Sequence, residues 1–479
     1  MTMMSLRRVL PIRPDRLARV PSAAALLMIT SAAFGQTAPA VSTIVAFNLS
    51  VPSGGVVMGT VGADGALYGT GTSRTIVSGG VVYRATRDGL SVKTLHQFQG
   101  TEGSTPAAGV IEGSDGLLYG STSYGAADQA YSTGTIYRLT KDGTNFTVLY
   151  RFASYSTINV VSMPVNADGA RPESQLLEGT DGYLYGVTAA GGANGTGVVF
   201  RMSRDGTAFQ LLHEFGAVAS SATDSVIKNE DGVTPVGRLL QAPDGYLYGT
   251  TSNGGVDGRG VIFRVHMDGS GFEVVHQFPA LSGDSPAINV DGARPVGGLT
   301  DGQNGLLYGV ANLGGANGVG TLYSLDPNSL LLTVLHDFDA PDGAFPAGGL
   351  ILALDGRLYG TTQGGGTNSS GAETTAGTIF SMALDGTGFT KHYSFDGSQG
   401  ASPNTRLLQL DDTTFAGVTP SGGTCGQGTL YSFSLTGATV VGNTGCGQKK
   451  KNKSGGGATD PFVVLIGAAL GLVSRRRRD

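Results

Sequence analysis

Short apolar segments separated by glycine-containing turns run through the middle of the chain, and the pattern is clearest between residues 236 and 278. Two Asp-Gly pairs, Asp244-Gly245 and Asp268-Gly269, each join two such segments, because Asp-Gly supplies the positive φ angles of a tight hairpin turn. A glycine loop at 254–260 separates the two hairpins. We therefore expect four strands in this unit, at residues 236–241, 246–251, 261–266 and 272–278.

The tripeptide Leu-Tyr-Gly marks the second strand of this unit and recurs along the chain. Its copies begin at Leu67, Leu118, Leu184, Leu247, Leu307 and Leu358, and a weaker seventh copy is Phe415-Ala416-Gly417. The spacings of 51, 66, 63, 60, 51 and 57 residues are too long for helical solenoid repeats but suit a four-stranded propeller blade. The sequence therefore predicts an all-β fold, a β-propeller of seven four-stranded blades.

The two ends of the repeat region do not coincide with the ends of blades. Residues 42–48 match the fourth strand of a blade, as at 333–338, yet they precede the first complete copy. The seventh copy loses its pattern after its third strand, at 428–434. We expect the N-terminal strand to complete the last blade, which closes the ring and removes exposed sheet edges. The predicted propeller domain spans residues 36–448.

The repeated phrase also resembles a known family. Asp-Gly-x-Leu-Tyr-Gly-Thr-Thr, followed by a Gly-Gly loop and Gly-x-Ile-Phe/Tyr, is similar to the GloVer tandem repeat over nearly the whole predicted domain. The resemblance implies a surface protein that carries one of several C-terminal anchoring signals. It implies no settled biochemical activity.

The N-terminal 35 residues have the features of a secretory signal peptide. Five arginines precede an apolar run at 23–29, and small residues follow up to Gly35, after which we expect cleavage. A transmembrane anchor is the alternative, but the run is well short of the roughly 20 residues that a bilayer span needs.

The C-terminal residues 449–479 have the features of a sorting or anchor segment. Four lysines lead to the linker Gly455, Gly456 and Gly457, and an apolar stretch at 461–473 precedes four arginines at 475–478. This tail resembles the GlyGly-CTERM signal, which implies cleavage near the glycines by a protease of the rhombosortase type. We expect the chain to be exported and then membrane-anchored at the cell surface or released after processing.

The charge of the two ends hides an acidic middle. The formal net charge is −5, with +4 in residues 1–35 and +6 in residues 449–479, which leaves −15 for the domain between them. Nucleic-acid binding relies on Lys and Arg that neutralise phosphates, so we expect no nucleic-acid partner.

The candidate metal and catalytic residues do not form a site by their spacing. His96, His213, His276, His336 and His392 fall in or near the phrase Leu-His-x-Phe of the fourth strand. Residues at the same position in each blade lie on a wide ring around the propeller axis. These histidines should therefore pack between blades and not converge on a metal or a substrate. The repeated Asp-Gly aspartates lack the clustered oxygens of a calcium site, which favours a turn role. We expect no catalytic residue, metal or cofactor.

Two cysteines, Cys425 and Cys446, lie in or just after the seventh copy. Outside the reducing cytoplasm we expect them to form a disulfide, with two free thiols as the alternative. The bridge would close a loop of about 20 residues and stabilise the fold by roughly 3 kcal/mol in the chain-entropy model.

Three long connections break the regularity of the repeats, at 153–173, 216–235 and 279–295. Each leads from a fourth strand into the first strand of the next blade, so all three should emerge on one face near the mouth of the central channel. Their related closing phrases supply a candidate binding rim, with turn capping as the alternative for Asn and Asp. The candidate residues are Asn166, Asp168, Arg171, Asn229, Asp231, Asn289, Asp291 and Arg294.

These features favour a non-catalytic, monomeric surface propeller that binds a protein or a glycan. The first alternative is an extracellular polysaccharide lyase or hydrolase, because propellers host such chemistry and a pair of carboxylates could lie among the loops. The second is a structural component of the cell envelope. The absence of Trp leaves only Tyr and Phe for stacking on sugars. The sequence does not name the ligand.

Overall fold

The computed structural model describes residues 38–46, 55–72, 79–125, 133–158, 163–219, 226–283, 285–367, 371–372 and 374–437. Within these residues the chain consists of β-strands and turns, with a single three-residue 3-10 helix, η1 (Gly100–Glu102). The predicted signal peptide, Cys446 and the C-terminal segment 449–479 lie outside the described residues.

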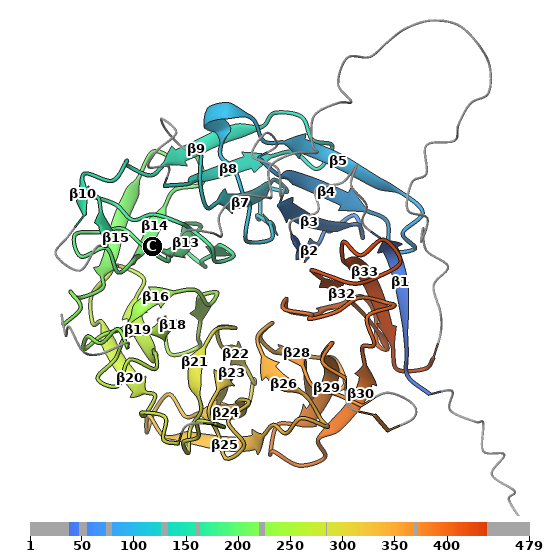
Figure 1. Ribbon diagram of the computed structural model, residues 1–479. Coiled ribbons are helices and arrows are strands. Elements are labelled where there is room, and N and C mark those ends of the chain that lie inside the picture. Colours follow the sequence, from blue (N-terminus) through green and yellow to red (C-terminus); the bar gives the residue numbers. More distant parts are fainter. Residues whose placement is uncertain are drawn as a thin grey trace, which may run out of the picture. The chain divides into compact units, whose positions relative to one another are not determined.

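Seven four-stranded antiparallel sheets form a ring, so the described domain is a seven-bladed β-propeller, as predicted (Figure 1). Blade 1 contains β2 (Gly55–Val61), β3 (Leu67–Thr72), β4 (Val81–Ala85) and β5 (Val92–Gln97). Blade 2 contains β6 (Ile111–Glu112), β7 (Leu118–Thr122), β8 (Thr135–Leu139) and β9 (Thr147–Arg151). Blade 3 contains β12 (Leu177–Glu178), β13 (Leu184–Thr188), β14 (Val198–Met202) and β15 (Phe209–Glu214). A small hairpin, β10 (Thr157–Ile158) and β11 (Pro164–Val165), lies in the connection between blades 2 and 3.

In blades 4, 5 and 6 the innermost strand is divided into two short pieces that pair with the same neighbour. Blade 4 contains β16 (Val233–Pro235), β17 (Leu240–Gln241), β18 (Tyr246–Asn253), β19 (Val261–His266) and β20 (Glu273–Gln277). Blade 5 contains β21 (Ala293–Pro295), β22 (Thr300–Asp301), β23 (Leu307–Leu313), β24 (Thr321–Leu325) and β25 (Leu332–Asp337). Blade 6 contains β26 (Ala344–Pro346), β27 (Ile351–Leu352), β28 (Arg357–Gly364), β29 (Thr378–Ala383) and β30 (Thr390–Ser394). The seventh blade contains β31 (Leu408–Gln409), β32 (Thr414–Thr419), β33 (Thr429–Ser434) and β1 (Ala40–Ala46).

The N-terminal strand closes the ring, which confirms the prediction. β1 pairs antiparallel with β33, from Ala40 opposite Ser434 to Ala46 opposite Thr429 (Figure 1). Ile44 is fully buried in a cluster with Leu67 of blade 1 and Val418 of blade 7. The first and last parts of the chain thus share one sheet and one part of the core.

The Leu-Tyr-Gly phrase builds the core between neighbouring blades. In blade 4, Leu247 and Tyr248 are fully buried, and the Tyr248 hydroxyl donates a hydrogen bond to the carboxylate of Asp244 at 2.7 Å. A Cβ on Gly249 would lie 2.3 Å from Cζ of Phe263 in the next strand, so only glycine leaves room for that ring. Asp244 also accepts a hydrogen bond from the backbone N–H of Tyr246, which is the turn role expected from the sequence.

Ring closure predicts a specific loss of stability. Replacing the fully buried Ile44 with Ala should lower the free energy of unfolding by about 2–5 kcal/mol, because it leaves a cavity where blades 7 and 1 meet. Urea unfolding followed by circular dichroism measures the change. Thr43→Ala on the same strand, whose side chain is only partly buried, is the matched control and should cost less than about 1 kcal/mol. Equal losses for the two variants would contradict the assigned closure.

Candidate functional site

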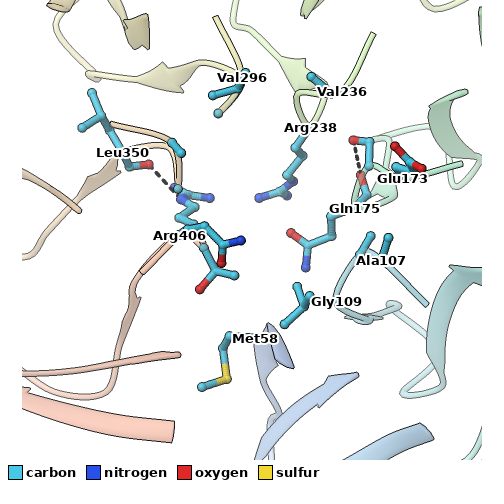
Figure 2. A pocket seen from close by; sticks show the side chains of 18 of the residues that line it. Met58, Ala107, Gly109, Glu173, Gln175, Val236, Arg238, Val296, Leu350 and Arg406 are labelled. Carbon is cyan, nitrogen blue, oxygen red and sulfur yellow. Dashed lines mark hydrogen bonds between the residues drawn. The ribbon is translucent and has the colours of Figure 1, made fainter. Parts of the chain in front are cut away.

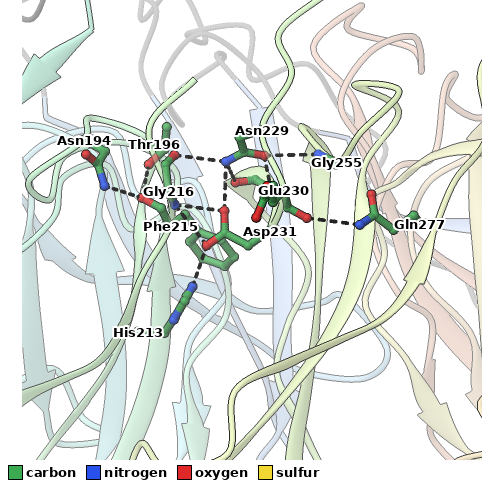
Figure 3. A network of polar contacts seen from close by, with 11 residues as sticks. Asn194, Thr196, His213, Phe215, Gly216, Asn229, Glu230, Asp231, Gly255 and Gln277 are labelled. Atoms are coloured by element: carbon green, nitrogen blue, oxygen red, sulfur yellow. Dashed lines mark hydrogen bonds and ion pairs between the residues drawn. The ribbon is translucent and has the colours of Figure 1, made fainter. Parts of the chain in front are cut away.

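The three candidate asparagines brace the long connections. Asn229 accepts hydrogen bonds from the backbone N–H groups of Gly232 and Gly255, at 2.8 and 3.1 Å, and its amide group donates to the carbonyls of Gly216 and Gly232 (Figure 3). Asn166 and Asn289 make the equivalent contacts in their own connections. This is the capping geometry considered as the alternative to a binding rim.

The candidate aspartates tie the same connections to the preceding fourth strand. Asp231 accepts two hydrogen bonds from the N–H of Gly216 and lies 2.9 Å from Nε2 of His213 (Figure 3). Asp168 accepts from the N–H of Ala153 and from the Tyr150 hydroxyl at 2.6 Å, and burial raises its pKa above the ordinary value. These carboxylates interact with their own chain. A direct contact with a ligand stays a prediction.

Three of the five fourth-strand histidines, His96, His213 and His336, stack on a phenylalanine of the next blade, as expected. The His213 ring stacks on Phe272 of the next blade, with ring centroids 3.4 Å apart, and meets Phe215 edge to face. His96 and His336 stack in the same way on Phe146 and Phe389. His276 faces Asp291, with Nε2 and Oδ2 3.3 Å apart, and its burial lowers its pKa despite that carboxylate.

The two candidate arginines share a backbone conformation that recurs at the same position of the repeat. The residue before the first-strand proline has a φ between 55° and 60° in every described copy, a region that non-glycine residues seldom adopt. This position holds Thr105, Arg171, Thr234, Arg294, Phe345 and Ser402. Arg171 is bound to Glu173 at 2.8 Å, whereas Arg294 is exposed and lines a cavity. At this one backbone position the copies therefore present side chains of four different types.

The mouth cavity, of about 450 Å³, lies among blades 4 to 7. Amide and hydroxyl groups predominate among its polar lining residues, and Asn312 and Asn253 make hydrogen bonds to Pro346 O and Ser252 Oγ. Arg294 is its charged member. The lining residues are Thr234, Val236, Ser252, Asn253, Arg294, Val296, Asn312, Ala347, Gln363 and Asn404.

The channel cavity, of about 190 Å³, continues below the mouth cavity and is lined by the first-strand regions of all seven blades (Figure 2). Val236, Val296, Ala347 and Asn404 line both cavities, so the two cavities adjoin one another. The channel is narrow because neighbouring backbones touch, and a Cβ on Gly297 would lie 2.5 Å from the Cα of Gly349.

Arg238 and Arg406 extend into the channel cavity from blades 4 and 7 (Figure 2). Protein surrounds both guanidinium groups, although each residue keeps some contact with water through the channel. Arg406 Nε donates to the carbonyl of Leu350 at 2.8 Å, while Arg238 Nε is buried with no hydrogen-bond partner among the described residues. Burial, followed by the charge of Arg238, lowers the pKa of Arg406 to about 10.

A distal cavity of about 370 Å³ lies at the other end of the channel and is also lined by Arg238 and Arg406. Its acidic residues, Glu112 and Glu178, form ion pairs with Lys141 and Arg204. These carboxylates therefore have their own cations.

Sequence reasoning missed the two channel arginines because it examined only the irregular connections. Each arginine lies three positions after the proline that recurs in the first strand of the repeat, Pro235 for Arg238 and Pro403 for Arg406. The same position holds Gly109, Gly298 and Gly349 in three other copies and Gln175 in a fourth. Aligning these six copies on the proline would have revealed arginine at a position that holds glycine in three of them.

The described residues contain no group of three or more His, Cys, Asp or Glu arranged to hold a metal ion. No helix in this part of the chain is long and apolar enough to cross a membrane. The predicted disulfide stays a prediction, since Cys446 lies beyond the described segments.

Comparison with known proteins identifies a family. A family model described as the Gloeobacter/Verrucomicrobia repeat matches residues 32–162, 154–290 and 221–372. No curated protein matches the sequence.

Solved structures with a similar arrangement of strands have low sequence identity. The GH74 xyloglucanase from Xanthomonas campestris is 15% identical, with a TM-score of 0.47, over 83% of this chain and 54% of that one. The oligogalacturonate lyase from Vibrio parahaemolyticus is 10% identical, with a TM-score of 0.45, over 83% and 97%. A chain of a nidogen/laminin complex is 17% identical, with a TM-score of 0.37, over 66% and 92%. Likeness at this level says nothing about activity.

The lowered pKa of His276 predicts a pH-dependent loss of stability. The unfolded chain binds a proton near the ordinary histidine value of about 6.5, whereas the folded chain resists protonation, so stability falls as the pH drops through and below that value. Between pH 7.5 and 5.5 the wild-type protein should lose more unfolding free energy than a His276→Gln variant. Urea titrations at both pH values test this, and identical losses would contradict it.

Proposed function

The chain belongs to the Gloeobacter/Verrucomicrobia repeat family, and on that premise we propose that it is an exported, non-catalytic propeller that binds a glycan in its mouth cavity. The observation that carries the proposal is the lining of that cavity, in which amide and hydroxyl side chains converge from several blades. Sugar hydroxyls both donate and accept hydrogen bonds, and so do these groups. A volume of about 450 Å³ lies within the range of small-ligand sites.

An aromatic side chain at the rim adds a surface for the apolar face of a sugar. Phe345 is 37% exposed and lies against Gly364, which directly follows Gln363 of the mouth cavity. A Cβ on Gly364 would approach the Phe345 ring at 3.3 Å, so glycine leaves the ring room to lie along the rim. The ring thus supports a glycan in a chain that has no Trp.

A glycan fits this site better than a protein partner does. Protein interfaces generally have an apolar core on a broad contact surface. The mouth cavity is concave, and Asn253, Asn312, Gln363 and Asn404 contribute side-chain amides to it. Specific hydrogen bonding to a narrow polar ligand is therefore the interaction that the site favours.

The carboxylates along the channel support binding without hydrolysis. A glycosidase generally needs two carboxyl groups that are free to transfer protons or attack the sugar. Glu173 lines the channel cavity, Glu112 and Glu178 line the distal cavity, and each is paired with a basic side chain. Each of these acids already contacts a basic side chain of the protein, which supports a binding role in place of hydrolysis.

Glycan binding is testable on the full chain. A glycan array followed by isothermal titration calorimetry should identify a saccharide whose affinity falls at least about tenfold in an Asn312→Ala, Gln363→Ala double variant, because two polar contacts are removed. Gln210→Ala, which removes an exposed amide on the outer strand β15, is the matched control and should leave the affinity unchanged. The saccharide should stay intact during long incubation. Unchanged binding by the double variant, or cleavage of the saccharide, would overturn the proposal.

We also propose that residues 1–35 direct export and that residues 449–479 hold the chain at the cell surface, before or after cleavage near Gly455, Gly456 and Gly457. The proposed Cys425–Cys446 disulfide requires such an oxidising location. Cell fractionation should find the full chain in the envelope and a variant ending at residue 448 in the medium. A full-length chain in the cytoplasm would contradict the proposed location.

A further inference from the structure

The contacts of the pair of arginines below the mouth cavity do not account for two charges at this place, since the hydrogen bond from Arg406 Nε to Leu350 is the one found for their side chains among the described residues. Arg238 and Arg406 come from blades 4 and 7, on different sides of the channel, and their guanidinium groups point into the same space (Figure 2). Each lies two residues after a lining residue of the mouth cavity, Val236 and Asn404. The two charges therefore lie in a cavity that adjoins the mouth cavity.

No acidic side chain among the described residues neutralises the pair. The carboxylates that line the connected cavities belong to Glu173, Glu112 and Glu178, and these form ion pairs with Arg171, Lys141 and Arg204. Neither Arg238 nor Arg406 makes an ion pair within the described part of the chain. Two like charges thus face the same cavity inside a domain that is otherwise strongly acidic.

An arrangement of this kind is costly without a ligand. A buried charge that lacks an opposite charge destabilises the protein, and a second like charge adds repulsion. The buried Arg238 Nε has no hydrogen-bond partner within the described residues, whereas Arg406 Nε is held by Leu350. Three repeat copies have glycine at the same position, so the repeat itself does not require arginine. These facts together point to an anionic ligand.

We infer that Arg238 and Arg406 form an oxyanion site that binds the carboxylate of an acidic saccharide, so that the glycan of the proposed function contains a uronate. This inference rests on the proposed function. A planar guanidinium group binds a carboxylate through two parallel N–H···O bonds, and two guanidinium groups supply donors from both sides of the channel. The amides of the mouth cavity bind the hydroxyl groups of neighbouring sugar units above it.

The decisive experiment compares two oligosaccharides that differ only in the acid. Calorimetry on the full chain would use a glucuronate-containing oligosaccharide and its carboxyl-reduced counterpart, in which each carboxylate is replaced by CH₂OH. The wild-type protein should bind the acidic form at least about tenfold more tightly, the size of effect expected for one charged contact. Equal affinities would overturn the inference without any variant, and so would tighter binding of a sulfate ester of the same backbone.

Variants then test whether the two arginines cause the preference for the acidic oligosaccharide. Arg238→Gln and Arg406→Gln should each remove most of the preference for the acidic form and leave the affinity for the reduced form unchanged. Arg406→Lys retains the charge without the planar fork and should keep part of the preference. Arg264→Gln, which removes an arginine paired with Glu273 on the outer part of blade 4, is the matched control. A preference that survives both glutamine variants would overturn the inference.

The outcomes also separate this inference from the proposed function. If neither oligosaccharide binds, but free glucuronate binds to the wild-type protein and not to Arg238→Gln, the oxyanion site stands and the mouth cavity is not a glycan site. If both oligosaccharides bind equally and the arginine variants change nothing, the glycan site stands and the oxyanion site is excluded.

Discussion

Each blade depends on one close contact between a glycine of its second strand and an aromatic ring of its third. In all seven blades, a Cβ on that glycine would lie between 2.3 and 2.5 Å from an atom of the aromatic side chain, either the tyrosine hydroxyl oxygen or the phenylalanine Cζ. The rings are those of Tyr83, Tyr137, Phe200, Phe263, Tyr323, Phe380 and Tyr431, and all are buried. Because any other residue would place a Cβ against the aromatic side chain, this glycine is the most constrained position of the repeat. The Leu and Tyr before it then point to the core between blades, and the Asp-Gly turn is held by the tyrosine hydroxyl in most copies.

This constraint explains why the fold could be predicted from the sequence. The phrase Leu-Tyr-Gly is local and repeated, so the number of its copies, with the weaker one at Phe415-Ala416-Gly417, predicts the number of blades. Closure of the ring was also predictable, because residues 42–48 match a fourth strand that the seventh copy lacks. The roles of Asn229 and Asp231 were less predictable. Asn and Asp near glycine suit both a turn and a binding rim, and only the three-dimensional contacts with Gly216, Gly255 and His213 show that these side chains brace the connection.

The channel arginines could not be identified by local reasoning for a different reason. Arg238 and Arg406 lie far apart in the chain and become neighbours only because the ring brings all first strands to one axis. A single arginine in either copy looks like an ordinary polar residue near a strand. The relevant signal is a difference between copies at one position, where Gly298 and Gly349 show what the repeat alone requires. The proposed binding groups therefore lie where the copies of the repeat differ from one another, both at the rim and inside the channel.

The pairing of β1 with β33 also determines the order in which the domain can be completed. The strand that is synthesised first, Ala40–Ala46, finds its partner only when Thr429–Ser434 has left the ribosome. Contacts between such distant segments form late and slow the folding of a chain. Until then, blade 7 has an open edge and Ile44 lacks its cover. A cell that makes this protein must keep both the strand and that edge from pairing with other chains for nearly the whole time of synthesis.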